Sequence, residues 1–455
     1  MKKKLPIGIE HFEKLHREDF YYVDKTFLLK DFLENWSEVN LFSRPRKFGK
    51  SLTLSMMQSF FEYGRDTSCF EGLSICKETK LCEQYMGKFP VIFLSLKDMV
   101  GRDFSETKNQ LRTIIGTEAL RFDFLKESKK LSSDDFWQYE QMIHPNQTTI
   151  YGMSDDLMTN SLFLLSRLLY QHYETPVILL IDEYDVPLDQ AYRNGYYDEM
   201  EHLLSKMFGA VLKGNPYLQF AVLMGCLQIT RESVFAGINH IHVLPSHDPL
   251  YQSYFGFTKE EVLDMLSYYE LKDAWENIDT WYGGYLFGST SLYCPWDILN
   301  ALFLLKQKKD TAWEPFWLRT SSNDLFIKFI RNTGIEHPGE IEKLLSDEAV
   351  FKPLDYRLTY RDLNNLSDHY WSLLYATGYL TIQPQEKNRE SALKIPNRSI
   401  YQLLMDQTLD MFRSSIRVDH ARLMRFCQAF PAEDTETIQE MFQEYLLKLP
   451  IRISA

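Results

Sequence analysis

The residues of this chain whose types and order best suit chemistry are a glycine, a lysine and a serine in succession, Gly49, Lys50 and Ser51. They follow a short apolar run at 39–42 and a basic turn, and they precede an amphipathic run at 52–61. A strand, a turn and a helix that begins with Gly-Lys-Ser are typical of a phosphate-binding loop, because unpaired N–H groups at the helix start attract anions. In this interpretation Lys50 binds the terminal phosphates and the Ser51 hydroxyl binds Mg²⁺.

The short Gly-Lys-Ser sequence has a second interpretation, an ordinary basic turn ahead of a surface helix. The full pattern G-x-x-x-x-G-K-[ST] is not met, because Arg44 stands at its first glycine position. If the loop does bind phosphate, the candidate nucleotide-binding residues are Arg44, Pro45, Arg46, Lys47, Phe48, Gly49, Lys50, Ser51 and Leu52.

A second stretch carries two neighbouring carboxylates. Five apolar residues at 177–181 follow Pro176 and precede Asp182 and Glu183. Such a run suits a central parallel strand covered on both faces, and ligands bind at the carboxyl ends of such strands. We expect Asp182 to hold Mg²⁺, directly or through water, and Glu183 to polarise the attacking water as the catalytic residue. A strand that simply ends at a charged turn would have the same sequence.

Length and composition limit the classes of protein. A chain of 455 residues is too long for one ordinary core, so two or three domains are expected. Apolar residues are 45% and charged residues 25%, which is typical of soluble globular proteins. The net charge of −13 argues against a chain-wide surface for nucleic acid or anionic membranes, although a local basic groove would be compatible with it.

Targeting signals and membrane spans are not expected. The basic start at Met1 is followed by no apolar stretch of the kind that signal peptides carry, and no run reaches the roughly 18 apolar residues of a membrane span. The six cysteines are scattered without a C-x-x-C pattern, which favours reduced thiols in a cytoplasmic protein.

The first 250 residues alternate between apolar runs and amphipathic segments. We expect strands at 39–42, 89–96, 176–182, 218–225 and 238–244, and helices at 27–36, 52–61, 105–122, 155–173 and 197–213. This alternation predicts an α/β fold, a P-loop NTPase-type parallel sheet with helices on both faces. A third strand should separate the loop strand from the acidic strand in space, which leaves room for a catalytic glutamate.

Polar and aromatic residues refine these expectations. Thr26 should cap the helix at 27–36, and Ser105 should cap the helix at 105–122. Tyr21 or Tyr22 could stack on a nucleotide base, with Lys25 helping to position the loop. The alternative is an aromatic core anchor with a local ion pair.

Beyond residue 250 the alternation stops and a mainly α C-terminal region is expected. A capping box from Thr258 to Glu261 predicts a helix start, and a glycine- and aromatic-rich hairpin-like stretch at 281–296 precedes another helix. Short β-like runs at 379–383 and 391–395 indicate a winged-helix-like module, with a plain helical bundle as the alternative. The expected domains are a P-loop domain at 1–250, a helical lid-like region at 251–345 and this C-terminal module at 346–455.

Together these stretches resemble a bacterial family usually named AAA-ATPase-like. The matching elements are GIEHFEKL at 8–15, YVDKT at 22–26, RPRKFGKS at 44–51, IDEYDVP at 181–187, GCLQITRESVFAGIN at 225–239, FGFTKEEV at 255–262 and WYGGYLFGSTSLYCPW at 281–296. The resemblance covers about 8–300 strongly and continues more weakly to about 440. It implies a nucleoside-triphosphate site, with ATP and Mg²⁺, built from residues 44–51, Asp182 and Glu183, and the family itself has an arginine at the position of Arg44.

The resemblance has two limits. Many members carry a PD-(D/E)XK nuclease-like domain, which we do not expect here because the last hundred residues hold no Asp…Glu-x-Lys pattern. Relatives often have Thr-Gly-Val-Leu-Arg after the fourth strand, where this chain has Met-Gly-Cys-Leu-Gln at 224–228. Gln228 and Arg231 remain the candidate sensors of the terminal phosphate, and Arg231 could equally be a helix-start arginine paired with a glutamate. Nucleotide binding is therefore better supported than hydrolysis.

Three functional hypotheses follow. The first is a Mg²⁺-dependent ATPase that couples ATP binding or hydrolysis to a conformational change, with a protein partner. The second is a nucleotide-binding switch or scaffold with little hydrolysis. The third is a DNA-associated regulatory ATPase that has lost its nuclease domain. Its basic candidates are Lys387, Arg389, Lys394 and Arg398, although the net charge does not support nucleic acid as a partner.

Overall fold

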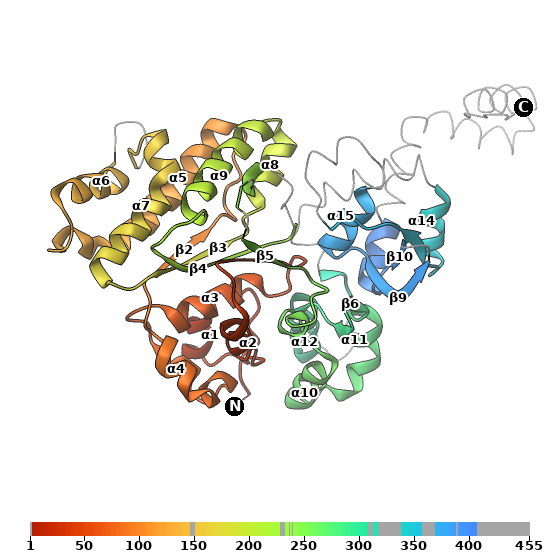
Figure 1. Ribbon diagram of the computed structural model, residues 1–455. Helices are drawn as coiled ribbons and strands as arrows, with labels where there is room; N and C mark the ends of the chain where they lie inside the picture. Colours follow the sequence, from red (N-terminus) through yellow and green to blue (C-terminus); the bar gives the residue numbers. More distant parts are fainter. Residues whose placement is uncertain are drawn as a thin grey trace, which may run out of the picture.

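The computed structural model describes residues 2–145, 151–227, 233–235, 237–238, 240–307, 313–316, 338–356, 369–387 and 390–406. A five-stranded parallel sheet with the order β2-β3-β4-β1-β5 lies at its centre (Figure 1). Its strands are β1 (Val39–Ser43), β2 (Val91–Ser95), β3 (Val177–Asp182), β4 (Leu218–Gly225) and β5 (Ile241–Leu244). The predicted parallel α/β fold is confirmed.

The strand order places the two candidate site strands on either side of β4. In the sheet register Met224 of β4 lies between Phe42 of β1 and Asp182 of β3. The carboxyl ends of β1 and β3 therefore meet the same edge of the sheet, separated by the single strand β4. The predicted third strand between the loop strand and the acidic strand is confirmed.

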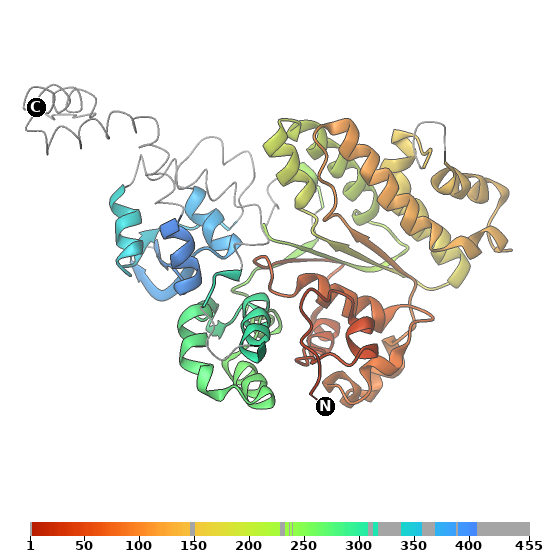
Figure 2. The same ribbon diagram turned by 180° about the vertical axis from the view of Figure 1, so that it is seen from behind.

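Helices cover both faces of the sheet (Figures 1 and 2). On one face lie α5 (Phe104–Leu120), α6 (Ser133–Ile143), α7 (Asp155–Tyr173), α8 (Val186–Asn194) and α9 (Tyr197–Leu212). On the other face lie α1 (Phe12–Arg17), α2 (Leu28–Asn35), α3 (Lys50–Phe61) and α4 (Thr79–Tyr85). Alternate strand residues supply the two cores: Leu179 packs with the first set of helices and Leu180 with the second. Short 3₁₀ helices lie at Thr67–Phe70, Ser74–Lys77, Asp123–Glu127, Ser233–Phe235, Gln252–Tyr254 and Lys272–Ala274.

Two predicted helix caps are wrong. The hydroxyl of Thr26 donates to the Asp24 carboxylate at 2.6 Å instead of capping α2. At the start of α5 the Asp103 carboxylate accepts from the backbone N–H of Glu106 at 2.9 Å, so Ser105 lies inside the helix. At α5 a carboxylate is the stronger acceptor and takes the role that the sequence assigned to a hydroxyl, whereas no side chain caps α2.

A second group of elements follows β5. It comprises α10 (Lys259–Tyr269), α11 (Trp275–Tyr282), the hairpin β6 (Tyr285–Phe287) and β7 (Thr290–Leu292), and α12 (Pro295–Gln307). The three helices share a small core of their own, whereas the hairpin packs into the same core as α3. The predicted capping box is present, since Thr258 accepts from the backbone of Glu261 and the Glu261 carboxylate accepts from the backbone of Thr258. The predicted hairpin is also confirmed.

The described C-terminal part combines a three-stranded antiparallel sheet with helices, the last of which includes residues 398–406. Its elements are α14 (Pro338–Leu345), β8 (Val350–Lys352), α15 (His369–Thr377), β9 (Thr381–Lys387) and β10 (Glu390–Lys394), with the strand order β8-β10-β9. The predicted β-like runs correspond to β9 and β10, so the described part is not a plain helical bundle. Within the described ranges, no helix combines the length and the apolar character needed to cross a bilayer.

Candidate functional site

The basic loop and α3 form the start of the site. Gly49 precedes the helix at φ 90°, ψ 14°, a left-handed conformation that a residue with a side chain rarely adopts. No side chain caps the helix start. The first N–H groups of α3 are therefore directed at the cavity, and together with the helix dipole they favour an anion there.

The Lys50 side chain folds back under the loop. Lys50 is 4% exposed, and its ammonium donates to the carbonyl oxygens of Arg44 and Pro45 at 3.3 and 3.2 Å and lies 3.3 Å from the Cys226 sulfur. Burial acts to lower the pKa of Lys50, but nearby acidic groups, among them Glu183, outweigh it and raise the pKa. Lys50 therefore stays charged at neutral pH.

Asp182 lies at the carboxyl end of β3 and is 2% exposed. Burial raises its pKa to about 6, the Glu183 charge adds to the shift, and a hydrogen bond from the Ser51 side chain opposes it. Among the described residues, Oδ1 of Asp182 has no hydrogen-bond partner. A buried carboxylate oxygen beside a hydroxyl is a donor set that suits a hard cation such as Mg²⁺.

The residues after Asp182 form a tight turn. Glu183 has φ 54°, unusual for a residue other than glycine, and its side chain lines the cavity. Asp185 is buried and accepts from the N–H groups of Cys226 and Leu227, both at 3.0 Å. Burial raises the pKa of Asp185 to about 6. Asp185 thus ties the acidic turn to the end of β4, a role that sequence reasoning did not assign although the residue belongs to the IDEYDVP element.

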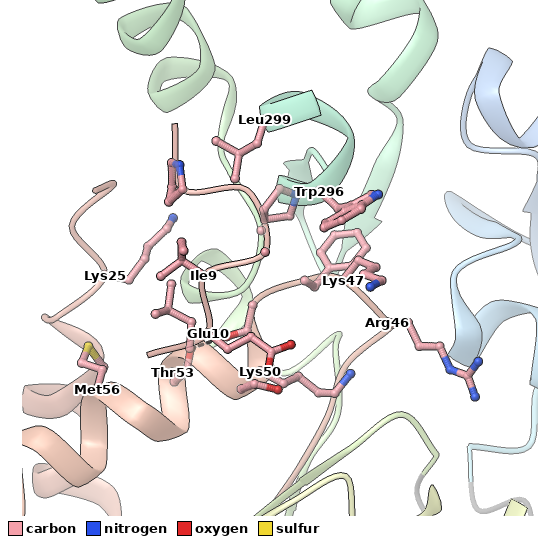
Figure 3. Close-up of a pocket in the computed structure, with 18 of the residues that line it drawn as sticks. Ile9, Glu10, Lys25, Arg46, Lys47, Lys50, Thr53, Met56, Trp296 and Leu299 are labelled. Atoms are coloured by element: carbon pink, nitrogen blue, oxygen red, sulfur yellow. Dashed lines mark hydrogen bonds between the residues drawn. The ribbon is translucent and has the colours of Figure 1, made fainter. Parts of the chain in front are cut away.

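A cavity of about 440 Å³ lies between the basic loop and the acidic turn (Figure 3). Its size lies within the usual range for small-ligand sites. Its phosphate-loop side is lined by Arg46, Lys47, Phe48, Gly49, Lys50, Ser51, Leu52 and Thr53, and Glu183 and Asp189 border the acidic side. The N-terminal segment and α12 close the remaining walls, with side chains that include Ile9, Glu10, Tyr21, Tyr22, Val23, Lys25, Trp296 and Leu299.

Arg44 does not line this cavity with its side chain. The side chain is 1% exposed, and its guanidinium donates to the carbonyl oxygens of Ser43 and Leu244 at 2.8 and 2.7 Å. It also lies 4.5 Å over the ring of Phe255, and burial lowers its pKa to about 9. The Arg44 side chain therefore connects β1 with β5 and with Phe255. Toward the Lys50 ammonium, Arg44 presents its backbone carbonyl, as Pro45 does.

The tip of the loop is inserted into the second group of elements. Phe48 is 1% exposed, and its ring centroid lies 5.1 Å from that of Tyr285 and 5.0 Å from that of Phe287. The Lys47 ammonium lies 4.5 Å over the Trp296 ring, and Lys47 itself has φ 69°. Sequence reasoning placed Phe48 and Lys47 at a nucleotide and missed these contacts with the hairpin and α12.

The aromatic segment before α2 shows features of both interpretations. Tyr21 and Tyr22 line the cavity, as base stacking would need. Lys25 makes an ion pair, but its partner is the distant Glu261, at 2.6 and 2.7 Å, and not a local carboxylate. Because Glu261 also caps α10, Lys25 fastens the N-terminal segment to the start of that helix.

The two candidate sensors, Gln228 and Arg231, lie outside the described residues. Met224 is fully buried at the end of β4. Cys226 takes the place beside Lys50, and burial raises the pKa of its thiol to about 11, so it is neutral at physiological pH.

Comparisons with known proteins extend these observations. A family model described as "Predicted AAA-ATPase" matches residues 6–235. An uncharacterised protein from the vnfD 5′ region of Azotobacter chroococcum mcd 1 is 24% identical over 457 residues, covering 99% of this chain and 78% of that protein. Among solved structures, a Walker-type ATPase of Pyrococcus abyssi is 14% identical with a TM-score of 0.42, over 89% of this chain and 99% of that one.

Proposed function

Because this chain belongs to the predicted AAA-ATPase family, we propose that it is a Mg²⁺-dependent ATPase that couples ATP binding or hydrolysis to a conformational change. One observation carries the proposal: Lys50, Ser51 and Glu183 line one cavity and the buried Asp182 accepts a hydrogen bond from Ser51, although about 130 residues of chain separate the loop from the acid pair. That arrangement combines a phosphate-binding loop with a metal-binding and water-positioning edge.

The loop is suited to hold the β- and γ-phosphates. The uncapped N–H groups of α3 and the charged Lys50 supply donors and positive charge in a place that the surrounding chain shields from water. The wall formed by Ile9, Val23 and Leu299 is apolar and suits the face of a nucleobase, with Tyr21 or Tyr22 as stacking partners.

Ser51 and Asp182 would hold Mg²⁺. The unpartnered Oδ1 of Asp182 and the neighbouring Ser51 hydroxyl fit this ion, which takes most of its remaining ligands from water and phosphate oxygens. When bound, the ion neutralises charge on the β- and γ-phosphate oxygens.

Glu183 would orient the attacking water. In hydrolysis the water oxygen bonds to the γ-phosphorus, and the bond from that phosphorus to the bridging oxygen breaks. ADP leaves with the electron pair, and the protons of the water end on inorganic phosphate and in solvent. Glu183 is among the residues that line the cavity, and its left-handed backbone sets it apart from the preceding strand, which supports this role.

The loop tip offers a route from nucleotide to the rest of the chain. Phe48 and Lys47 contact the β6–β7 hairpin and α12, so a shift of the loop on phosphate binding would be transmitted to these elements. We propose the corresponding division into a P-loop domain at 1–250, a lid-like region at 251–345 and a C-terminal module at 346–455 that faces a protein partner.

The test compares nucleotide binding and turnover in three proteins. Lys50→Ala should bind Mg²⁺·ATP about 100-fold or more weakly than wild type, because a buried charge-assisted contact is lost. Glu183→Gln should bind as wild type does and lose about 100-fold in turnover. Lys30→Ala removes a lysine whose ion pair with Glu78 lies on the surface, and it should behave as wild type in both assays. Equal ATP affinity in Lys50→Ala and wild type would refute the site.

A second candidate function, a nucleotide switch with little hydrolysis, is favoured by the end of β4. Met224 is buried there and Cys226 presents a neutral thiol to Lys50, where a polar side chain would help to sense the terminal phosphate. A phosphate-release assay separates the two, since turnover well above that of Glu183→Gln would reject the switch. Of the basic candidates for DNA binding, Lys394 pairs with Asp347 and Arg398 lies over Trp281, whereas Arg389 and the Lys387 side chain lie outside the described residues.

A further inference from the structure

Arg46 occupies the middle of the basic loop and has a position unlike that of its neighbours. Arg44 is buried under the sheet edge and Lys47 lies over Trp296, whereas Arg46 lines the cavity and is 30% exposed. In Figure 3 its guanidinium extends outward from the loop, away from the other labelled side chains. Arg46 is therefore a cation at the mouth of the cavity.

The backbone of Arg46 lies close to the point where the terminal phosphate is expected. The carbonyl of the preceding residue, Pro45, accepts from the Lys50 ammonium at 3.2 Å, so the backbone next to Arg46 touches the group that would bind that phosphate. The Arg46 charge also acts to lower the pKa of Cys226, whose sulfur is 3.3 Å from the same ammonium. A rotation about side-chain bonds would turn the guanidinium toward this point without moving the loop backbone.

Asp189 on α8 is the ion-pair partner of Arg46, at 3.7 Å between Nη2 and Oδ2. Asp189 is 3% exposed, and Arg193 already binds both of its oxygens, through Nε at 3.1 Å and Nη2 at 2.9 Å. The carboxylate would therefore keep a close counter-ion if Arg46 moved away. A buried carboxylate left with no partner would oppose such a movement strongly, and Arg193 removes that obstacle.

We propose that Arg46 is the residue that distinguishes a nucleoside triphosphate from a diphosphate, and that Asp189 holds its guanidinium beside the cavity until a γ-phosphate is present. This inference rests on the proposed nucleotide site and adds the specificity of that site for the terminal phosphate. The planar guanidinium matches the oxygens of a phosphate in a two-point contact, which a lysine cannot make. The α8 helix, which directly follows the acidic turn, then loses one of its contacts with the loop whenever a triphosphate binds.

The experiment measures the affinities of the β,γ-imido analogue of ATP and of ADP, each with Mg²⁺, by titration calorimetry. In Arg46→Ala the analogue should bind about 10- to 100-fold more weakly, because a charge-assisted hydrogen-bond donor is lost, while ADP affinity changes by no more than about threefold. Retained ADP binding also shows that the variant has kept its fold. Arg46→Lys should fall between wild type and Arg46→Ala.

Two matched variants test the part played by Asp189. Asp189→Asn removes the competing charge, so the analogue should bind about threefold more tightly with ADP unchanged. Arg193→Ala, at a residue outside the cavity lining, removes the counter-ion that lets Asp189 release Arg46, so the analogue should bind about threefold more weakly with ADP unchanged. If wild type binds both nucleotides and Arg46→Ala keeps the wild-type ratio, this inference alone is overturned. If wild type binds neither nucleotide, the proposed function fails with it.

Discussion

The contact between the loop tip and the β6–β7 hairpin leads to a quantitative prediction. Phe48 is 1% exposed and Phe287 is 4% exposed, with their ring centroids 5.0 Å apart. Replacing a buried phenylalanine by alanine costs about 3–5 kcal/mol of unfolding free energy. An aromatic pair at this distance contributes about 0.5–1.5 kcal/mol beyond the buried area. We therefore expect Phe48→Ala and Phe287→Ala to be coupled by about 1 kcal/mol.

The assay is a double-mutant cycle measured by urea unfolding of wild type, the two single variants and the double variant. The double variant should be less destabilised than the sum of the two single variants, because the second substitution removes a contact that the first has already lost. Phe48→Ala combined with Met142→Ala is the matched control, since Met142 is equally buried but lies in the core on the other face of the sheet. That pair should be additive within about 0.5 kcal/mol.

The same variants connect the contact to nucleotide binding. Phe287 is not among the residues that line the cavity, yet Phe287→Ala should weaken ATP binding several-fold, because the loop loses part of the surface that fixes its tip. Additivity of the Phe48 and Phe287 variants would refute the packing argument. Wild-type ATP affinity in Phe287→Ala would refute the idea that the hairpin supports the loop.

Three further predictions follow from single contacts. Arg44→Ala should lower the unfolding free energy by about 2–4 kcal/mol in a denaturation experiment, because two charge-assisted hydrogen bonds are lost. The folded variant should still bind ATP within about threefold of wild type. A large loss of ATP affinity with normal stability would contradict the buried role of Arg44. Ser51→Ala should weaken ATP binding, measured by titration, about tenfold when Mg²⁺ is present and leave it unchanged in EDTA. An equal loss of affinity in both conditions would exclude Ser51 as a metal ligand. Gly256→Ala should lower the melting temperature, because Gly256 has φ 93° and an added Cβ would lie 3.0 Å from Phe48. The control is Gly209→Ala in α9, where an added Cβ would have no neighbour within 4 Å beyond its own stretch of helix, and this variant should be neutral or stabilising.

Much of the sheet could be predicted because its strands are continuous apolar runs. The expected bounds of β4 and of α7 agree with the structure residue by residue, since the first is a run buried between two strands and the second has a clear amphipathic period. By contrast no helix was expected where α8 forms, just after the acidic strand. Proline is tolerated in the first turn of a helix, and α8 begins at Val186.

In the candidate site, too, some features could be predicted from the sequence and others could not. The order of Lys50, Asp182 and Glu183 along the chain predicts that they lie close together, because parallel strands bring their carboxyl ends to one edge. In the structure Lys50 and Glu183 line one cavity, and Asp182 is buried beside Ser51. The inward turn of Arg44 could not be predicted, since its acceptor Leu244 and its ring partner Phe255 are about 200 residues away. The short strand β8, with three residues, carries too little pattern to be recognised.

The most direct test of the central claim is a crystal structure of the protein with Mg²⁺ and the β,γ-imido analogue of ATP. The account predicts the β- and γ-phosphates over the start of α3 within hydrogen-bond distance of the Lys50 ammonium, with the metal ion between Ser51 and Asp182 and a water near Glu183. A nucleotide bound elsewhere on the chain, or a metal ion with no contact to Ser51 or Asp182, would contradict it.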